Sequence, residues 1–504
     1  MQADKSPRTP IKAALPGQFD QQNISHSIFH FISFFFNMRS SLQLLSLLLT
    51  FSPNALVAAK LDVNDQNSIK NISSTAASAI IKSYKYGLEQ YRITGLFEIL
   101  EEEYLWGATG EIWNSMLEYS HLTGDTQFNE AVASGLLHQT GERIVAFMPE
   151  NQTKILGNRD QSQWGLAAMT AAEINLDIPK DAQNLKGPES PPVTSWLDLA
   201  KTVFDTQLER WGSEECSGGL HAQIFPYNNG FTIKSTGENG NFLLLAARLA
   251  RFTGNKTYVE WAEKSFEWSK TVGLVKDFRV LDSSDIRDNC TMKNDVEWAA
   301  YHAAYTEASA IMYNITNATE PWITAIDGFA NTSSAFLHEE KLYDIAHDQQ
   351  KYDPETIGLF SKTVVTRSYA RAMKAAPHVS EKLQKIVSAA AVQCATPWEE
   401  KMGSGNTTVN GSIELLEGAV NALAATQALL WPQAKALAPD VSNSTNSTTA
   451  DEGGATSGAD ANKPGASGNA ESPKPEAGKS GAPGQPGLSL GLLVGLLGAA
   501  ISLL

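Results

Sequence analysis

The chain has 504 residues, of which 42% are hydrophobic, and its formal net charge at pH 7 is −16 with a pI near 5.1. A surface this acidic excludes nucleic acid and anionic lipid headgroups as favoured partners, because contacts to phosphate need a basic surface. A neutral ligand such as a polysaccharide is compatible with this charge.

The N-terminal region carries the parts of a secretory signal peptide. Arg39 supplies a basic start after Met38, an apolar run follows, and small residues precede a cleavage site after Ala59. We therefore expect residues 38–59 to be the signal peptide and residues 1–37 to be an upstream extension. Translation that starts at Met38 would omit this extension, whereas a longer signal that begins at the first residue would include it. Both alternatives give the same mature protein.

Residues 60–437 are predicted to form one helical domain, because no internal stretch resembles a linker. Apolar residues recur there at three- and four-residue steps, which is typical of amphipathic helices. Twelve segments show this pattern, near residues 75–92, 108–123, 127–147, 162–176, 195–209, 238–252, 256–271, 296–313, 320–338, 358–374, 380–395 and 411–430.

A weak repeat within this domain predicts helical hairpins. Residues 117–134, 247–266 and 309–328 each read as helix, short polar turn and helix. An aromatic residue follows each turn, where it could pack back on the preceding helix: Phe128, Tyr258 and Trp322. Two-helix units must stack on neighbours to bury their apolar faces. Twelve helices without capping repeats favour closure, so we predict an all-α fold, an (α/α)6 barrel.

The cysteines and glycosylation sequons fit a secreted protein. Cys216, Cys290 and Cys394 allow one disulfide and one spare thiol, with the pairing open, and their spacing resembles no metal motif. We expect neither a metal nor a cofactor. About eleven Asn-x-Ser/Thr sequons lie between the two terminal signals. Those expected to be glycosylated are Asn71, Asn151, Asn255, Asn289, Asn314, Asn317, Asn331, Asn406 and Asn410.

The C-terminal region predicts a stalk followed by a glycolipid-anchor signal. Residues 438–480 are rich in Ser, Gly, Ala and Pro and cannot bury enough apolar surface to offset the entropy of ordering. Residues 481–504 combine a Pro/Gly spacer with an apolar tail that no charge follows, which is the order of a GPI-attachment signal. Ser480 is the predicted attachment residue, and a tail-anchoring helix is the alternative. The expected location is the cell surface, as a GPI-anchored protein of the plasma membrane or cell wall.

Three stretches carry a resemblance to a known family: GATGEIWNSMLEYSHLTGD, GNRDQSQWGLAAMTAAE and CSGGLHAQIFPYNNGFTIKSTGENGNFLLLAARLARFTGN. They resemble glycoside hydrolase family 76, the fungal endo-α-1,6-mannanases and their anchored cell-wall relatives of the Dfg5 and Dcw1 kind. The similarity spans residues 65–435 in order. It implies an (α/α)6 barrel and a retaining reaction, in which one carboxylate attacks the anomeric carbon of a mannosyl unit and a second carboxyl protonates the leaving oxygen.

The catalytic motif departs from the family pattern at one position. Family members carry N-D-D-Q-x-x-W, which resembles Asn158–Trp164 here, so Asp160 matches the acid/base while Arg159 occupies the nucleophile position. An arginine cannot form the glycosyl ester, and a cation about 5 Å from the anomeric centre would oppose the charge that develops there. We also expect Arg159 to lower the pKa of Asp160 by favouring its anion.

Other departures affect groups that would contact sugar. The family tends to read W-T-Y-N-Q-G where this chain has Trp298–Ala303, and an Arg-Trp pair where this chain has His221 and Ala222. The residues that could still hold a mannan chain are Trp106, Gln161, Trp164, Lys234, Asn239 and Trp298. Core packing is the alternative role for a tryptophan at helical spacing, and helix capping near Ser162 is the alternative for Asp160.

Other carboxylates are candidates to replace the missing nucleophile. One is the cluster Asp282, Asp285 and Asp288, which we expect in a loop between helices, and others are Glu111 and Glu118.

Two functions follow from the resemblance. The first is a mannan endo-1,6-alpha-mannosidase-like glycosidase or transglycosidase in fungal cell-wall biogenesis. The second is a catalytically inactive mannan-binding wall protein. The expected partners are α-1,6-mannan or a mannosylated glycan and, through the anchor, a membrane, but not nucleic acid.

Overall fold

The computed structural model describes residues 60–97, 106–142, 145–180, 192–212, 214–344, 361–404 and 413–437. Several predictions from the sequence lie outside these residues. They are the upstream extension, the signal peptide, the stalk, the anchor signal with Ser480, and the sequons at Asn406 and Asn410.

Twelve α-helices form the described part of the chain, which confirms the predicted all-α class and helix number. None of them is long and apolar enough to cross a bilayer. Their bounds are α3 (Gln66–Tyr91), α4 (Trp106–Thr123), α5 (Asn129–His138), α6 (Asn158–Glu173), α7 (Trp196–Glu209), α8 (Thr236–Thr253), α9 (Lys256–Val272), α10 (Ala299–Ile315), α11 (Trp322–Thr332), α13 (Ser361–Ala375), α14 (Ser380–Gly403) and α15 (Ile413–Ala428). Short 3-10 turns are η2 (Glu150–Gln152), η3 (Ile286–Asp288), η4 (Ser333–Phe336), η5 (Pro377–Val379) and η6 (Trp431–Gln433).

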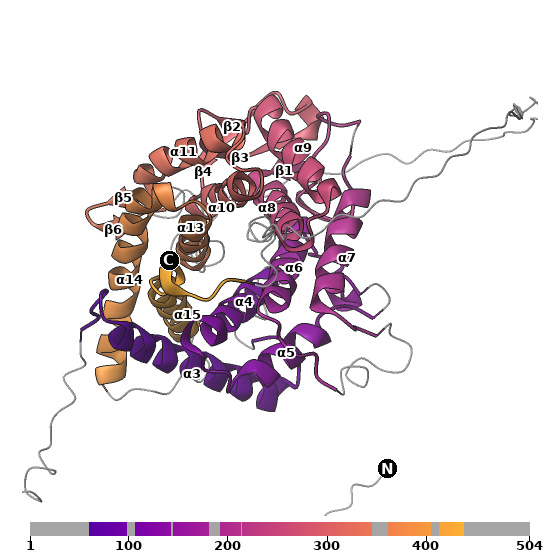
Figure 1. Cartoon of the computed structure of the whole chain (residues 1–504). Helices are drawn as coiled ribbons and strands as arrows, with labels where there is room; N and C mark the ends of the chain where they lie inside the picture. The colour runs from indigo at the N-terminus through magenta and orange to yellow at the C-terminus, as the bar shows by residue number, and fades with distance from the viewer. Residues whose placement is uncertain are drawn as a thin grey trace, which may run out of the picture. The chain divides into compact units, whose positions relative to one another are not determined.

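The helices form two concentric rings, as the predicted (α/α)6 barrel requires. Helices α4, α6, α8, α10, α13 and α15 pack side by side in that order, and α15 returns to α4 to close the inner ring. The other six helices lie outside them (Figure 1). Inner and outer helices alternate along the chain, so every outer helix carries the chain back and the six inner helices run in the same direction. All their N-termini therefore lie at one end of the barrel.

The turn between α8 and α9 is formed by residues whose conformational preferences end one helix and begin the next. Helix α8 ends at Gly254 in the left-handed conformation, with φ 67°, and Asn255 caps α9 by accepting a hydrogen bond from the Thr257 N–H at 3.0 Å. This Thr-Gly-Asn sequence stops one helix and starts the next, because glycine adopts positive φ without strain and asparagine is a favoured N-cap.

The aromatic residues after the turns all contact other aromatic rings, and Phe128 packs back on the preceding helix as expected. Phe128 lies against Tyr119 of the preceding helix α4, with ring centroids 6.2 Å apart. Tyr258 instead contacts Phe204 of α7, and Trp322 stacks on Phe266 of α9. For these two residues, packing on the helix before the turn stays a prediction.

A small antiparallel sheet is the main element that the helical pattern of the sequence did not predict. It consists of β1 (Ile233–Ser235), β2 (Val275–Lys276), β3 (Arg279–Asp285) and β4 (Asn294–Glu297), with β1, β2 and β4 all pairing with β3. A two-stranded pair, β5 (Leu337–His338) and β6 (Lys341–Leu342), lies apart from it. These strands are short, and β3 ends in Asp and Ser residues that disfavour strands on propensity alone. The acidic cluster therefore begins in a strand and not in the loop that we expected.

A buried network of arginines and glutamates joins the inner helices near their C-terminal ends. Glu173 of α6 accepts hydrogen bonds from Arg248 and Arg251 of α8, at 2.7 and 2.8 Å, and from Arg371 of α13 at 3.0 Å. Arg371 also binds Glu118 of α4 at 2.7 Å. Glu173 is 1% exposed, and the surrounding arginines hold the pKa of its carboxyl well below the usual range, although burial alone would raise it.

Glu173→Gln should lower the free energy of unfolding by about 3–5 kcal/mol, because removing one partner of a buried ion-pair network leaves the remaining charges uncompensated. Chemical denaturation at pH 7 measures this loss. Its folded-state pKa is lowered, so the contribution of Glu173 should be complete above the unfolded value near 4.5 and decline as the pH falls. The matched control is Glu381→Gln in an exposed pair with Lys385, which should change stability by about 0.5 kcal/mol or less. Equal effects of the two substitutions would contradict the structural role of Glu173.

Candidate active site

Polar residues collect where the inner helices begin. Asp160 lies in the first turn of α6, Glu238 in the first turn of α8 and Tyr301 in the first turn of α10. Gly107 at the start of α4 lies against Asp160, since a Cβ built on Gly107 would clash with the Asp160 Oδ1 atom. The N-terminal ends of helices favour negative charge. The parallel direction of the inner helices thus gathers carboxyl groups at one end of the barrel.

Hydrogen bonds fix the start of α6, which carries the motif. The Asn158 N–H donates to the Ala222 carbonyl at 3.0 Å, and the Asn158 side-chain amide donates to the His221 carbonyl at 2.8 Å. Arg210 in turn donates to Asn158 Oδ1 from both Nε and Nη2, at 3.0 and 2.8 Å. The two residues that follow Asn158 are therefore held on a rigid backbone.

Asp160 lies inside the first turn of α6, because the helix begins at Asn158 and not near Ser162 as predicted. Its Oδ2 atom accepts a hydrogen bond from the Gly157 N–H at 3.2 Å, so part of the capping role expected as an alternative is present. The residue as a whole is nevertheless partly exposed. Capping of the helix therefore does not exclude a further role for Asp160.

Burial raises the pKa of Asp160 to about 6, while Arg159 and the Gly157 N–H oppose that rise. We expected Arg159 to lower this pKa. Arg159 does act in the expected direction, but the desolvation of the carboxyl outweighs it. Asp160 can therefore hold a proton in mildly acidic solution, as a general acid requires.

Arg159 turns toward α10. Its Nη1 donates to the Tyr301 hydroxyl at 2.8 Å, and its Cζ lies 5.5 Å from the centre of the Tyr301 ring. Gly237 makes room for both side chains, because a Cβ there would lie 2.8 Å from Tyr301 Cζ and 3.1 Å from Arg159 Cδ. The absence of a side chain at Gly237 therefore makes room for the hydrogen-bonded pair of Arg159 and Tyr301.

Glu238 is a second carboxyl of the site, and we did not predict it from the sequence. It is 2% exposed and accepts hydrogen bonds from the Ser235 N–H at 2.8 Å and the Ser235 hydroxyl at 2.7 Å. Burial raises its pKa to about 7, and these hydrogen bonds and Arg159 oppose the rise. The sequence Ser235-Thr236-Gly237-Glu238 is a capping box, Ser-x-x-Glu, and this signal could have located the residue and the true start of α8.

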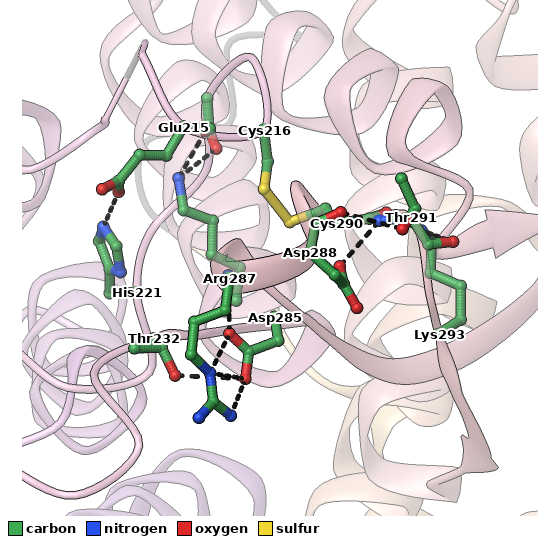
Figure 2. Close-up of a disulfide and its surroundings, with 12 residues drawn as sticks. Glu215, Cys216, His221, Thr232, Asp285, Arg287, Asp288, Cys290, Thr291 and Lys293 are labelled. Atoms are coloured by element: carbon green, nitrogen blue, oxygen red, sulfur yellow. Dashed lines mark hydrogen bonds and ion pairs between the residues drawn. A yellow bond between two sulfur atoms is a disulfide. The ribbon is translucent and has the colours of Figure 1, made fainter.

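The structure separates the members of the predicted acidic cluster. Burial raises the pKa of Asp282; hydrogen bonds from the side chains of Ser283, Trp298 and Asn294 oppose that rise, and the charge of Arg159 opposes it by a smaller amount. Asp285 pairs with the exposed Arg287 at the end of β3, and Asp288 accepts from the Thr291 N–H (Figure 2). Of the three residues, Asp282 is thus the one that joins the candidate site. Its carboxylate accepts hydrogen bonds from Trp298 Nε1 at 2.9 Å and from the Asn294 amide at 2.8 Å.

Glu111 and Glu118 do not reach this group of residues. Both are almost completely buried, and they pair with Arg367 and Arg371 of α13. They belong to the buried network between the inner helices, so the structure gives them a structural role. The suggestion that either could replace the missing nucleophile is therefore not retained.

Three of the predicted sugar-binding residues pack around the start of α6. Trp106 and Trp164 stack with ring centroids 5.1 Å apart, and Trp164 Nε1 donates to the Trp106 carbonyl at 3.1 Å. Gln161 donates to the Ala146 carbonyl at 2.8 Å. Trp164 and Gln161 have no exposed surface and Trp106 is 4% exposed. These side chains support the backbone of the site, and direct sugar contact by them stays a prediction.

The other three predicted residues also have protein partners. Lys234 Nζ donates to the carbonyls of Glu215 and Gly218, and Asn239 exchanges hydrogen bonds with the backbone of Leu220. Both side chains are fully buried. Trp298 is 5% exposed and donates to Asp282, so it is the member of this set that connects directly to a carboxyl of the site.

A disulfide fastens the loops beside the site. Cys216 is bonded to Cys290, and Cys394 is a buried free thiol, which agrees with one disulfide and one spare cysteine. Figure 2 shows this bond joining the loop that holds Glu215 and His221 to the end of the sheet at Asp285. His221 Nε2 lies 3.0 Å from the Glu215 carboxylate. In the described part of the chain, no group of three His, Cys, Asp or Glu residues is arranged to hold a metal ion.

Comparisons with known proteins match this chain over most of its helical domain. A family model described as glycosyl hydrolase family 76 matches residues 68–440. Mannan endo-1,6-alpha-mannosidase DCW1 of Saccharomyces cerevisiae is 37% identical over 57% of this chain and 62% of that protein. Mannan endo-1,6-alpha-mannosidase DFG5 of the same yeast is 29% identical over 76% of this chain and 84% of that protein. The chain thus spans less than two thirds of the length of DCW1.

Solved structures show the same architecture. The crystal structure of Dfg5 from Chaetomium thermophilum in complex with glucosamine has a TM-score of 0.65 and 30% identity, and the match covers 76% of this chain and 94% of that one. An inactive variant of the alpha-1,6-mannanase GH76A of Salegentibacter sp. HEL1_6, with two consecutive aspartates replaced, holds alpha-1,6-mannotriose. It has a TM-score of 0.52 and 13% identity, with 72% of this chain and 99% of that chain covered, so it shows the fold alone.

Arg159→Met should raise the pKa of Asp160 above about 6, because it removes the cation that opposes the effect of burial. Carbon NMR titration of the labelled aspartate side chain measures this pKa. Arg287→Met removes an exposed arginine that pairs with Asp285 and should leave the pKa of Asp160 unchanged. An unchanged or lower pKa in Arg159→Met would show that Arg159 does not act on Asp160 as the structure indicates.

Proposed function

Because this chain belongs to glycosyl hydrolase family 76, as its sequence motifs suggested, we propose that it is a glycosidase or transglycosidase that acts on α-1,6-linked mannosyl chains. Its substrate would be α-1,6-mannan or a mannosylated glycan of the fungal cell wall. The relatives named mannan endo-1,6-alpha-mannosidase support this substrate class. So does the mannotriose held by the bacterial structure of the same fold.

The observation that carries this proposal is the state of Asp160. This residue is partly exposed, lies in the first turn of α6 where a hydrogen bond from Gly157 holds its carboxyl, and burial raises the pKa of that carboxyl to about 6. A carboxyl with this pKa can donate a proton to the departing glycosidic oxygen below pH 6. Asp160 therefore fits the general acid that the family motif assigns to its position.

The nucleophilic step of the family's reaction lacks the carboxylate residue that usually carries it out. In double displacement the nucleophilic carboxylate would come from the position of Arg159, and a guanidinium cannot form a glycosyl ester. Arg159 is also engaged with Tyr301, so its side chain is held in place beside Asp160. This observation favours a second candidate function, a catalytically inactive wall protein that binds mannan.

The proposed location is the outside of the cell. The signal peptide at residues 38–59 and the anchor signal with Ser480 support secretion followed by attachment to the plasma membrane or cell wall through a GPI anchor. The sequon asparagines in the described residues are at least partly exposed, as N-glycosylation requires, namely Asn71, Asn151, Asn255, Asn289, Asn314, Asn317 and Asn331. The acidic surface fits a neutral glycan partner better than nucleic acid.

Asp160→Asn should reduce turnover of an unbranched α-1,6-mannan oligosaccharide by about 100-fold or more, because it removes the proton donor. The assay uses the secreted domain and separates the products by chromatography. Wild-type turnover should decline as the pH rises through about 6, since Asp160 then loses its proton. The matched control is Asp288→Asn, in the exposed turn after β3, which should leave turnover unchanged. An Asp160→Asn variant as active as the wild type would remove Asp160 from the reaction.

The inactive alternative makes a different prediction for the same assay. If the wild type and Asp160→Asn both bind mannotriose without cleaving it, the protein is a binder. Arg159→Asp, which restores the family motif, would then be the variant that gains cleavage. Calorimetric titration with mannotriose measures binding independently of turnover.

A further inference from the structure

The side chain of Tyr227 lies on the surface of the loop before β1, residues 222–232. It is 68% exposed, and among the side chains that the structure describes no other aromatic residue is mostly exposed. The Asn228 N–H donates to the Phe225 carbonyl at 3.0 Å, which closes a four-residue turn with Pro226 and Tyr227 at its centre. Proline is favoured at the first central position of such a turn because its ring fixes φ. A defined turn therefore presents Tyr227 to solvent.

The ring of Tyr227 is held in place by its neighbour Phe225. The two rings stack with centroids 5.3 Å apart and an angle of 11° between their planes. Phe225 is half-buried and packs against the hydrophobic core, so it supports the outer ring from below. One face of Tyr227 is thereby covered and the other is left for a ligand. A ring that is already ordered loses little conformational entropy when a ligand binds to it.

The loop is fastened to the segment that leads into α6. Gln223 pairs with Gly157 across an antiparallel bridge, and the Asn228 side-chain amide donates to the Thr153 carbonyl at 3.0 Å. Helix α6 begins directly after Gly157 and carries the candidate general acid in its first turn. The backbone that positions the candidate general acid thus also positions the loop.

Tyr227 therefore lies at the same end of the barrel as Asp160. Its Cα is within about 14 Å of the Gln223 Cα, because four residues of extended chain span at most about 3.6 Å each. At the other end of the loop, the Thr232 hydroxyl donates to Asp285 at the end of β3 at 3.3 Å (Figure 2). Both ends of the loop are thus fixed, and a substrate chain of several sugar units can contact Tyr227 and Asp160 at once.

The chemistry of the loop fits a neutral sugar. Its eleven residues include no Asp, Glu, Lys or Arg, although the chain has a net charge of −16. Asn229, two residues after Tyr227, is exposed and offers an amide that donates and accepts hydrogen bonds. The apolar C–H face of a sugar ring can lie on an aromatic face, while its hydroxyls bind amides. A charged partner would find no opposite charge on the loop itself.

We propose that Tyr227 is a stacking platform for a mannosyl unit of the substrate that is remote from the bond to be cleaved. This inference rests on the proposed function. Tyr227 lies on a surface loop and the candidate general acid lies in the first turn of α6, so the two contact different units of one chain. Stacking on Tyr227 is the same before and during bond cleavage. It therefore contributes to affinity, which appears in KM and not in kcat.

Loss of the ring should weaken the binding of α-1,6-mannohexaose. Tyr227→Ala should raise both the dissociation constant from calorimetric titration and KM by about 10-fold, because the stacking surface is lost. Tyr227→Phe should bind like the wild type, since it keeps the aromatic face, and kcat should be the same in all three proteins. Proton NMR should show the ring signals of Tyr227 shifting when mannohexaose is added, which a purely structural role would not produce.

The matched control is Val392→Ala, which shortens an exposed apolar side chain on the outer helix α14 and should change neither constant. A Tyr227→Ala variant that binds mannohexaose like the wild type would overturn the platform and leave the proposed function standing. A loss of affinity that Tyr227→Phe shares with Tyr227→Ala would also overturn it, because the aromatic face would then not be the binding surface. A wild type that binds no mannohexaose would overturn both proposals.

Discussion

One buried carboxylate, that of Glu173, connects three of the six inner helices. It belongs to α6 and accepts hydrogen bonds from two arginines of α8 and from Arg371 of α13. Arg371 extends the network to α4 through Glu118. Such a network costs desolvation energy and is satisfied only when every partner is in place. The network therefore links four of the six inner helices, α4, α6, α8 and α13.

The same helix, α6, connects this network to the candidate active site. Asp160 and Glu173 lie in its first and last turns, about 20 Å apart at 1.5 Å per residue. The closed ring turns the six helix starts toward one end, where carboxyls from α6, α8 and the small sheet surround Arg159. The substitution at the motif is accommodated locally, because Gly237 leaves space for the Arg159 and Tyr301 side chains. The site is therefore a cluster of carboxyls around the Arg159 side chain. Its chemistry depends on which of these carboxyls are not already held by protein hydrogen bonds.

Much of the fold could be predicted because its signals are local. The three- and four-residue spacing of apolar residues located all twelve helices, and turn residues such as Gly254 and Asn255 marked their ends. The short strands were missed because their pairing depends on residues distant in sequence, as between Lys234 and Ser284. The lowering effect of Arg159 on the pKa of Asp160 could be predicted because the two residues are neighbours in sequence, but the burial that outweighs this effect could not.

The sequence by itself determined the helical class, the family motif and the identity of the residue at its nucleophile position, because each of these depends on spacing along the chain. Only the tertiary structure decided which carboxyls meet Arg159. Asp282 and Asp285 are three residues apart, yet one lies near Arg159 and the other is paired with Arg287. Glu238 reaches the site from a helix about 80 residues away in sequence from Asp160. Hydrogen-bond partners and burial are properties of neighbours in space, and closing the barrel is what brings those neighbours together.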